Sequence, residues 1–252
     1  MKDEFVHLHL HTDYSMLDGA CAIGALADLV VERGSPAVAC TDHGNMCGAV
    51  EFYQEMAAKG VKPIVGCEMY VAPAARTDRN PRDAHAQGFH LVLLAKDVTG
   101  YRNLCHLNRL AWLEGYYYKP RIDKEALARH SEGLIALSAC VAGEVPARIL
   151  EGNDAGAVAA LRQYLDIFGR HDFYLELQDH GMDEERRANR RLLELSHEFG
   201  VPVVATNDAH YLLREHAPAH DVLLCIGTQK TLDDPSRLRF SGPEYYVKSP
   251  EE

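Results

Sequence analysis

Histidine recurs at every second position near the start of the chain. The segment "FVHLHLHT" places His7, His9 and His11 between apolar residues. In a strand, side chains two positions apart point to the same face, so these three imidazoles would line one side of it. Imidazole is a common ligand of zinc, manganese and iron. The spacing therefore predicts a metal site on this face, with His9 and His11 nearest the carboxyl end of the strand.

Further potential ligands lie in or after the later apolar runs. These candidates are Asp18, His43, Glu68, His90, Cys140, Asp208 and His210. Three of them have open alternatives. Asp18 precedes a glycine and could serve only in a turn, while Cys140 could be a small buried apolar residue. His90 lies near the start of its run, so its register alone does not decide which way it faces.

Seven short β-rich runs alternate with segments of helical periodicity. The strand candidates are residues 5–10, 37–41, 63–71, 89–95, 133–138, 173–177 and 201–206. The helix candidates are residues 23–33, 46–59, 98–113, 123–130, 142–168 and 183–199, with one more expected within 211–252. Alternating β and α units predict parallel strands joined by right-handed crossovers, and seven units favour a closed barrel. The strand ends of a barrel meet at one mouth, where the candidate ligands would converge.

Length and composition favour one soluble α/β domain. The 252 residues contain no linker and no apolar run long enough to span a membrane, and we expect a cytoplasmic protein. The seven cysteines lack metal-binding spacing and are expected to be reduced. A net charge of -11 excludes a protein that binds nucleic acid over its whole surface. Bound cations could still make the charge positive at one site. The ending "SPEE" resembles a helix start that is cut short, so we expect a fragment.

The candidate ligands outnumber what one ion can use. Two or three divalent ions sharing a bridging carboxylate are therefore implied. Histidines with carboxylates and one thiolate suit zinc, manganese or iron better than magnesium or calcium. Clusters of this type activate water and stabilise the charge of a phosphate during ester cleavage.

Motifs along the whole chain resemble one family, the PHP (polymerase and histidinol phosphatase) domain, and within it the N-terminal domains of bacterial DNA polymerase III alpha subunits. The similarity rests on "FVHLHLHTDYSMLDGA", "ACTDHGNMCGAVEFY", "PIVGCEMYVAP", "HLVLLAKDVTGYRNL", "GYYYKPRID", "GLIALSACVAGEVP", "FYLELQDHG", "VPVVATNDAHYL" and "AHDVLLCIGTQKTLDDPSRLRF". It implies a single domain over residues 1–252 with a distorted (βα)7 TIM-like barrel. Residues 211–252 would then be an extension leading toward a polymerase palm domain.

The resemblance also implies a site of three metals and its ligands. The family's ligand positions correspond to His9, His11, Asp18, His43, Glu68, His90, Cys140, Asp208 and His210, and none is replaced. We interpret His9, His11, Glu68 and Asp208 as catalytic, and His7 and Asp42 as residues that orient ligands through hydrogen bonds.

Within the family, an intact ligand set resembles the branch in which the domain is itself a metal-dependent 3′–5′ exonuclease that removes mispaired nucleotides from a DNA 3′ end. The polymerase core would lie elsewhere in a longer parent chain, so these residues alone are not expected to polymerise DNA. Two alternatives remain. The domain could be a metal-stabilised scaffold for a separate proofreading subunit, or a phosphomonoesterase like the histidinol phosphatases.

Substrate contacts are expected from two segments beside the mouth. "EGYYYKPRID" combines tyrosines with Lys119 and Arg121, and Tyr118 could stack on a base while the cations hold phosphate. His180 follows the sixth strand and could also touch substrate. The alternatives are that the tyrosine segment packs against another domain and that His180 only closes its loop.

Overall fold

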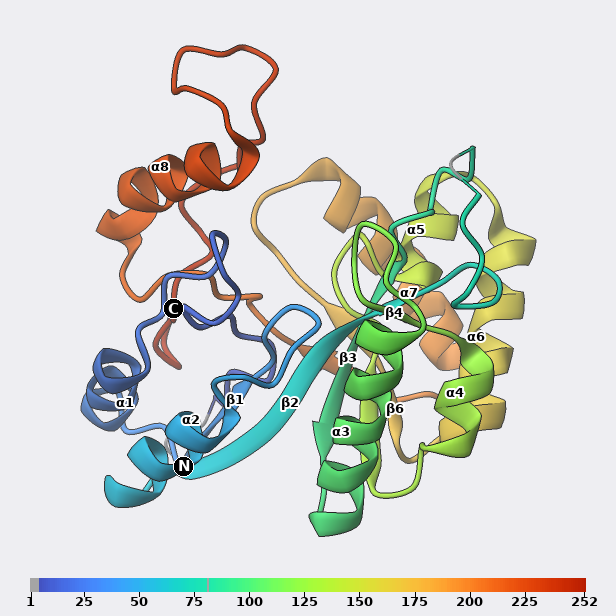
Figure 1. Cartoon of the computed structure of the whole chain (residues 1–252), viewed down its shortest axis with the longest axis horizontal. Coiled ribbons are helices and arrows are strands. Elements are labelled where there is room, and N and C mark those ends of the chain that lie inside the picture. Colours follow the sequence, from blue (N-terminus) through green and yellow to red (C-terminus); the bar gives the residue numbers. More distant parts are fainter. Residues whose placement is uncertain (1–4, 81) are drawn as a thin grey trace.

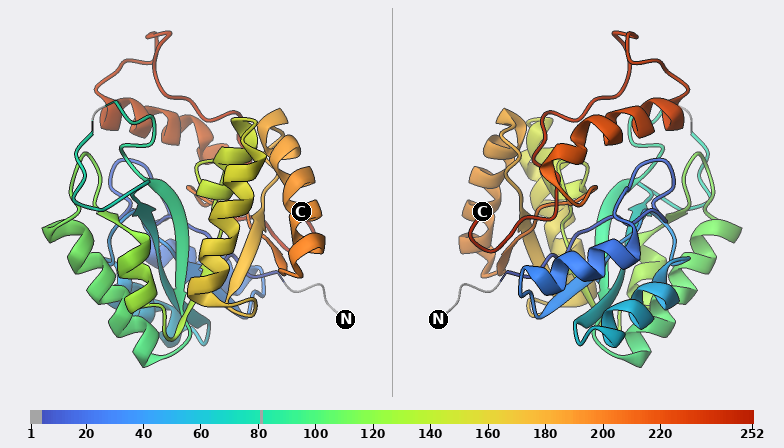
Figure 2. Two further views of the ribbon diagram at one scale, coloured as in Figure 1. Left: turned by 90° about the vertical axis from the view of Figure 1, so that its right-hand side faces the viewer. Right: turned by 90° about the vertical axis from the view of Figure 1, so that its left-hand side faces the viewer.

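The computed structural model describes residues 5–80 and 82–252. Its sheet follows one path of six strands, with a short seventh strand, β4 (Arg121–Ile122), beside β2. In path order these six are β1 (Ala37–Cys40), β2 (Lys62–Val71), β3 (Phe89–Ala95), β5 (Leu134–Leu137), β6 (Phe173–Leu177) and β7 (Val203–Ala205). Figures 1 and 2 show the sheet curling inside a layer of helices. This arrangement confirms the predicted α/β class.

The helices agree with the sequence periodicity except in one place. They are α1 (Ile23–Glu32), α2 (Ala49–Ala58), α3 (Val98–Leu113), α4 (Lys124–Arg129), α5 (Glu144–Leu150), α6 (Asp154–Phe168), α7 (Asp183–Phe199) and α8 (Ala217–Thr228), with a short 3-10 turn η1 (Arg214–His216) before α8. The single helix expected over 142–168 is wrong. Gly152 has a positive φ of 74°, and Asn153 begins α6 by accepting a hydrogen bond from the Gly156 amide.

The expected first strand, 5–10, is not a regular strand, because its backbone bonds irregularly to chains on both sides. On one side it accepts hydrogen bonds from β1 and the residue after it, and on the other it bonds to the segment after β7. The bonds are Ala39 N to His7 O (2.8 Å), Thr41 N to Leu10 O (3.0 Å) and His11 N to Ala209 O (2.8 Å). The segment therefore joins the two edges of the sheet and carries His9 and His11 between them.

The prediction that all strands are parallel is wrong for β3. It runs antiparallel to both β2 and β5, whereas the β1–β2, β5–β6 and β6–β7 pairs are parallel. The described residues between β2 and β3, 72–80 and 82–88, contain no helix, and a parallel pair needs a crossover of that kind. The segment 72–88 instead returns the chain at the same end of the sheet.

Strand alternation separates a helix-facing core from the interior of the curled sheet. Leu91 and Leu93 of β3 pack with the apolar faces of the surrounding helices, while Val92 and Leu94 pack with Ala39 and Leu137 in an interior cluster. In β2 the same alternation sends Cys67 and Met69 to the helix side. Glu68 and Tyr70 therefore face the interior, at the end where the candidate ligands lie.

Helix α8 packs over the loop that contains Asp18. His220 Nε2 lies 2.7 Å from the Asp18 carbonyl oxygen, and a side chain at Gly227 would meet the Leu17 carbonyl. The following loop, red in Figure 1, projects beyond the rest of the domain. Within the described residues, none of these helices has the length and apolar character needed to cross a bilayer.

Candidate metal centre

Glu68 lies at the centre of the candidate ligands. Its Oε1 is 2.8 Å from His90 Nδ1 and 3.3 Å from His9 Nε2. Its Oε2 is 2.5 Å from His43 Nδ1 and 3.7 Å from His11 Nε2. Each carboxylate oxygen thus faces two imidazoles, which is the arrangement expected of a bridging ligand.

Asp208 forms a second point of convergence. Its Oδ1 lies 3.1 Å from His11 Nε2, 3.2 Å from His9 Nε2 and 3.7 Å from His210 Nδ1. Asp208 has a φ of 43°, which is unusual for a residue other than glycine. The turn after β7 holds this carboxylate against the N-terminal histidines despite that backbone conformation.

The remaining two candidates lie at the edge of the same cluster. Asp18 Oδ2 is 3.0 Å from His43 Nε2, and Asp18 Oδ1 is 3.9 Å from His210 Nε2. Cys140 Sγ is 3.7 Å from His90 Nδ1. All nine predicted ligands therefore form one continuous cluster, although they come from segments spread over two hundred residues.

His90 faces this cluster because β3 is antiparallel. Its first residues lie at the mouth, and the register pairs His90 with Tyr70 while Glu68 pairs with Val92. The sequence left the orientation of His90 open, because the predicted parallel sheet would place only the ends of strands at the mouth, and His90 lies near the start of its strand. The reversed strand instead begins there.

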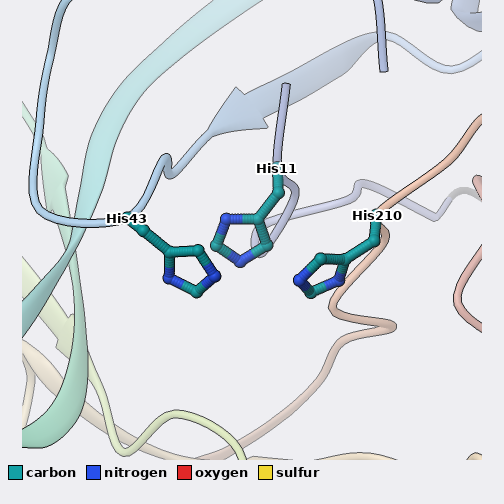
Figure 3. A group of neighbouring side chains, drawn as sticks. All are labelled: His11, His43 and His210. Carbon is teal, nitrogen blue, oxygen red and sulfur yellow. The ribbon is translucent and has the colours of Figure 1, made fainter. Parts of the chain in front are cut away.

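Three overlapping groups of side chains have the spacing of metal ligands. Their donor atoms lie within 4.8 Å of one another in the triads His11–His43–His210, His9–His11–Asp208 and His43–Glu68–His90. Figure 3 shows the first triad, with the three rings turned toward a common space. His11 and His43 each belong to two triads, which suits a cluster of several cations better than one isolated ion.

Buried polar atoms without hydrogen-bond partners are concentrated in this cluster. Among the described residues, six such atoms belong to predicted ligands: His9 Nε2, His11 Nε2, Asp18 Oδ1, His43 Nδ1, Glu68 Oε2 and Asp208 Oδ1. Leaving a buried polar atom unpaired is costly. Since these atoms point at one another, the donor set fits divalent cations that would coordinate them.

The side chains of the cluster shift one another's pKa. Burial lowers the pKa of His11 to about 4, and the neighbouring His43 and His210 add to this shift. Burial also opposes a charge on His43, but the carboxylates of Glu68 and Asp18 outweigh it and raise the pKa of His43 to about 10. Burial raises the pKa of the Cys140 thiol well above its usual value. With raised pKa values, His43 and Cys140 hold protons that they must lose before they can coordinate a cation. Metal binding would therefore release protons.

The cluster has a closed side and an open side. The side chains of His9 and His11 are fully buried and Glu68 is 1% exposed, whereas His43, His90 and Asp18 are 15%, 21% and 33% exposed. The cluster can therefore be reached from solvent on the side of His43, His90 and Asp18.

Asp42 reaches the cluster through Ser15, as a residue that orients a ligand would. Ser15 Oγ donates to Asp42 Oδ1 at 2.7 Å and lies 3.0 Å from His11 Nδ1. His11 Nδ1 then donates to Ser15, which leaves Nε2 free for a cation. His7 does not occupy such a position, because its Nε2 donates to the Lys248 carbonyl at 3.0 Å, away from the ligands.

Two functional contacts were absent from the sequence interpretation. Glu176 Oε1 lies 2.7 Å from His9 Nδ1 and also accepts hydrogen bonds from Gln178 and Thr206. His220 of α8 holds the Asp18 loop. An acid between two leucines in "FYLELQ" was the available signal for Glu176, since it shares a strand face with Gln178. No local signal pointed to His220.

The structure separates the four predicted substrate contacts into two pairs. Tyr118 and Lys119 are exposed. Arg121 is 2% exposed, and its guanidinium donates to the carbonyls of Gly115, Ala86, Arg76 and Asp78. His180 is 4% exposed and contacts Glu185 and the Asn207 carbonyl. The donors of Arg121 and His180 are therefore used inside the protein, and neither is free to touch substrate.

Known proteins similar to this chain are polymerase subunits. DNA polymerase III subunit alpha of Treponema pallidum is 49% identical over 247 residues, which cover 98% of this chain and 21% of that protein. The same subunit of Thermus aquaticus is 51% identical over 254 residues, which cover 100% of this chain and 21% of that protein. The chain thus spans about a fifth of the length of these curated relatives.

Comparisons of fold and family agree with the sequence motifs. A crystal structure of a proposed metal-dependent phosphoesterase from Bifidobacterium adolescentis superimposes with a TM-score of 0.53 at 16% identity, covering 82% of this chain and 88% of that one. This likeness supports the predicted distorted α/β barrel. A family profile described as "PHP domain" matches residues 7–180. Since the profile matches more than half of the residues, the chain belongs to the PHP domain family.

Proposed function

We propose that this chain is a metal-dependent phosphodiesterase that removes nucleotides from DNA 3′ ends, as the proofreading domain of a bacterial DNA polymerase III alpha subunit. Residues 1–252 form the single PHP domain of this proposal, with 211–252 leading toward the polymerase core. The partners are a DNA 3′ end and that core. The cofactors are two or three divalent ions, zinc, manganese or iron.

The observation that carries the proposal is the set of unpaired, buried donor atoms that face one another. Each unpaired buried group costs stability unless a cation coordinates it. The partly exposed side at His43, His90 and Asp18 would leave such cations open to a substrate, which a purely structural metal site does not need. The polymerase relatives favour DNA over a small phosphomonoester as the substrate.

The chain's own residues hold the site in one arrangement. Glu176 and Ser15 accept hydrogen bonds from Nδ1 of His9 and His11, so that both rings present Nε2 to the cluster. Glu68 and Asp208 place anionic oxygens between the imidazoles. Cations bound there would activate water and stabilise the charge that develops on phosphate. The partly exposed His43 and His90 lie where the substrate phosphate would enter.

An exonuclease assay tests this function. Protein loaded with Mn²⁺ or Zn²⁺ is incubated with a primer that carries a 3′ mispair, and shortening of the primer is measured. We expect cleavage by the parent chain and at least a 100-fold lower rate for His9→Ala and for Asp208→Ala, since each substitution removes a central ligand.

Several results would contradict the proposal. Equal activity in all three proteins would indicate a contaminating nuclease. Complete metal binding without hydrolysis of any phosphate ester would favour a scaffold. Hydrolysis of histidinol phosphate without any action on DNA would favour a phosphomonoesterase.

A further inference from the structure

Large aromatic side chains are exposed beside the open side of the metal cluster. Trp112, at the end of α3, is 48% exposed, and Tyr116 and Tyr118 in the following loop are 51% and 62% exposed. The rings of Trp112 and Tyr116 stack with centroids 5.6 Å apart. We call these three residues together with Lys119 the aromatic ledge.

The aromatic ledge is attached directly to the turn that carries His43. Trp112 Nε1 donates to the Gly44 carbonyl at 2.8 Å. A side chain at Gly44 would meet Pro120 at 2.6 Å and the Tyr70 ring at 3.1 Å. The loop that follows α3 therefore packs against the residue next to a predicted ligand.

Tyr70 connects the ledge to the cluster. Lys119 Nζ lies over the Tyr70 ring, 5.3 Å from its centroid. Two predicted ligands also lie beside that ring, His43 at 6.1 Å and His90 at 5.1 Å between centroids. Lys119 thus links the exposed ledge to the Tyr70 ring, which in turn lies against the two partly exposed histidines.

The tip of the ledge is held in place despite its backbone conformation. Tyr118 has a φ of 61°, which is rare for a large side chain. The adjacent Tyr117 ring lies beside the guanidinium groups of Arg79 and Arg121, at 5.7 Å and 5.1 Å. Arg121 is in turn fixed by four backbone carbonyls. This support keeps Tyr118 turned outward, and an exposed ring with a strained backbone is a recurrent feature of ligand contacts.

The charge of the ledge favours an anionic ligand. Lys119 is exposed, and its amino group forms no ion pair with a carboxylate in residues 5–80 or 82–252. In a chain of net charge -11, exposed aromatic faces beside this cation form a local surface that can hold an anionic ligand. Aromatic faces stack on bases of any sequence while cations hold the phosphates between them.

We propose that the aromatic ledge binds the bases next to the 3′ end of a single DNA strand by stacking, with Lys119 on the backbone, and so directs that end toward His43 and His90. The inference rests on the proposed nuclease function for its substrate class. It adds the residues that would distinguish an unpaired end from a paired one, because bases within a duplex cannot stack on protein rings.

The only tryptophan of the chain lies in the ledge, so its fluorescence reports on this surface alone. The probe is a six-nucleotide oligothymidylate added to protein stripped of metal by a chelator, which prevents cleavage. We expect quenching of the Trp112 emission that saturates with concentration. Tyr116→Ala and Tyr118→Ala should each weaken binding about 10-fold, which lies within the usual range for loss of one stacking partner.

Matched variants separate stacking from a change of fold. Tyr116→Phe keeps the ring and should bind like the parent. Tyr53→Ala removes a tyrosine of similar exposure, 55%, from α2 and should also leave binding unchanged. Lys119→Ala should reduce the dependence of binding on salt concentration, because fewer counterions are then released.

The outcomes distinguish this inference from the nuclease proposal. Quenching that depends on Tyr116 and Tyr118, without cleavage of any DNA by metal-loaded protein, would support the ledge and contradict the nuclease. Cleavage of DNA with no quenching, or with equal binding by every variant, would overturn the ledge inference. The ledge would then be a surface for protein packing.

Discussion

At the scale of single residues, the most buried imidazoles are oriented by side chains outside the ligand set. Glu176 holds His9, and Ser15, itself bonded to Asp42, holds His11. Each partner fixes the proton on Nδ1 and leaves Nε2 free, which also raises the basicity of the ring toward a cation. These contacts explain why two histidines can present the same atom to one centre.

Removing the charge of Glu176 should weaken metal binding. Glu176→Gln keeps the shape of the side chain but replaces a carboxylate that accepts from three donors, His9, Gln178 and Thr206. We expect a 10- to 100-fold loss of zinc or manganese affinity, measured by competition with a chromophoric chelator. Glu132→Gln is the matched control, since Glu132 is exposed. Equal affinities in both variants would show that Glu176 does not support the site.

At the scale of elements, the distance to neighbouring backbone decides which glycines can be replaced by alanine without a clash. A side chain at Gly100, in the first turn of α3, would lie 1.9 Å from the Gly133 carbonyl oxygen. Gly24 in α1 has no atom within 4 Å of the same position. The same substitution therefore has opposite expected effects in two helices.

Gly100→Ala should destabilise the fold by about 1–3 kcal/mol, because α3 must move away from the turn before β5. Gly24→Ala should instead stabilise it by about 0.5–1 kcal/mol, since alanine favours the helix and meets nothing. Urea unfolding at equilibrium measures both. A destabilised Gly24→Ala protein would contradict the packing of α1.

Asp123 joins α4 to the segment after β2. Its carboxylate accepts hydrogen bonds from the Ala126 amide at 2.9 Å and from the Arg76 amide at 2.9 Å. Burial raises the pKa of Asp123, but these two hydrogen bonds, together with the nearby Arg76 guanidinium, outweigh it and hold the pKa below its ordinary value. The depressed pKa means that the carboxylate stabilises the fold above the unfolded pKa of about 3.9, and that this contribution is lost as the pH falls through the folded pKa.

Asp123→Asn should therefore cost about 1–3 kcal/mol at pH 7 and progressively less below pH 4. Denaturant unfolding of parent and variant at pH 7 and at pH 3 measures the difference. Asp166→Asn, at an exposed position of α6, serves as the control and should show little change at either pH. A cost that is equal at both pH values would rule out the ionised carboxylate as the source of the stability.

At the scale of the whole molecule, the candidate ligand cluster joins a segment near the start of the chain to the turn after β7. His9 and His11 come from the segment that bridges the sheet edges, and Asp208 and His210 come from the turn after β7. Cations that bind only this folded arrangement stabilise it in proportion to the logarithm of their concentration.

Chelation should therefore lower the melting temperature. At a metal concentration 100 times Kd the stabilisation is about 2.7 kcal/mol, which corresponds to roughly 5–10 °C for a chain of this size. A His11→Ala, Asp208→Ala double variant should melt at the same temperature with and without chelator. An unchanged melting temperature of the parent chain would mean that no cation is bound at the cluster.

The sequence by itself determined the types of the candidate ligands, most of the elements and the family. Of the seven strand runs predicted from apolar runs and breakers, six contain strands in the structure. Strand and helix periodicity are local properties, so the sequence alone can reveal them. The alternation in "HLHLHT" placed His9 and His11 on one face, although their segment forms no regular strand.

Only the tertiary structure decided how the distant groups meet. The orientation of His90 followed from the antiparallel direction of β3, and the role of Glu176 followed from its contact with a residue far away in the chain. Arg121 has the same charge as Lys119 but is held by backbone carbonyls, and no local pattern separates them. Strand direction and burial arise from pairings across the whole chain, and the chemistry of a buried polar group depends on the partners that those pairings bring to it.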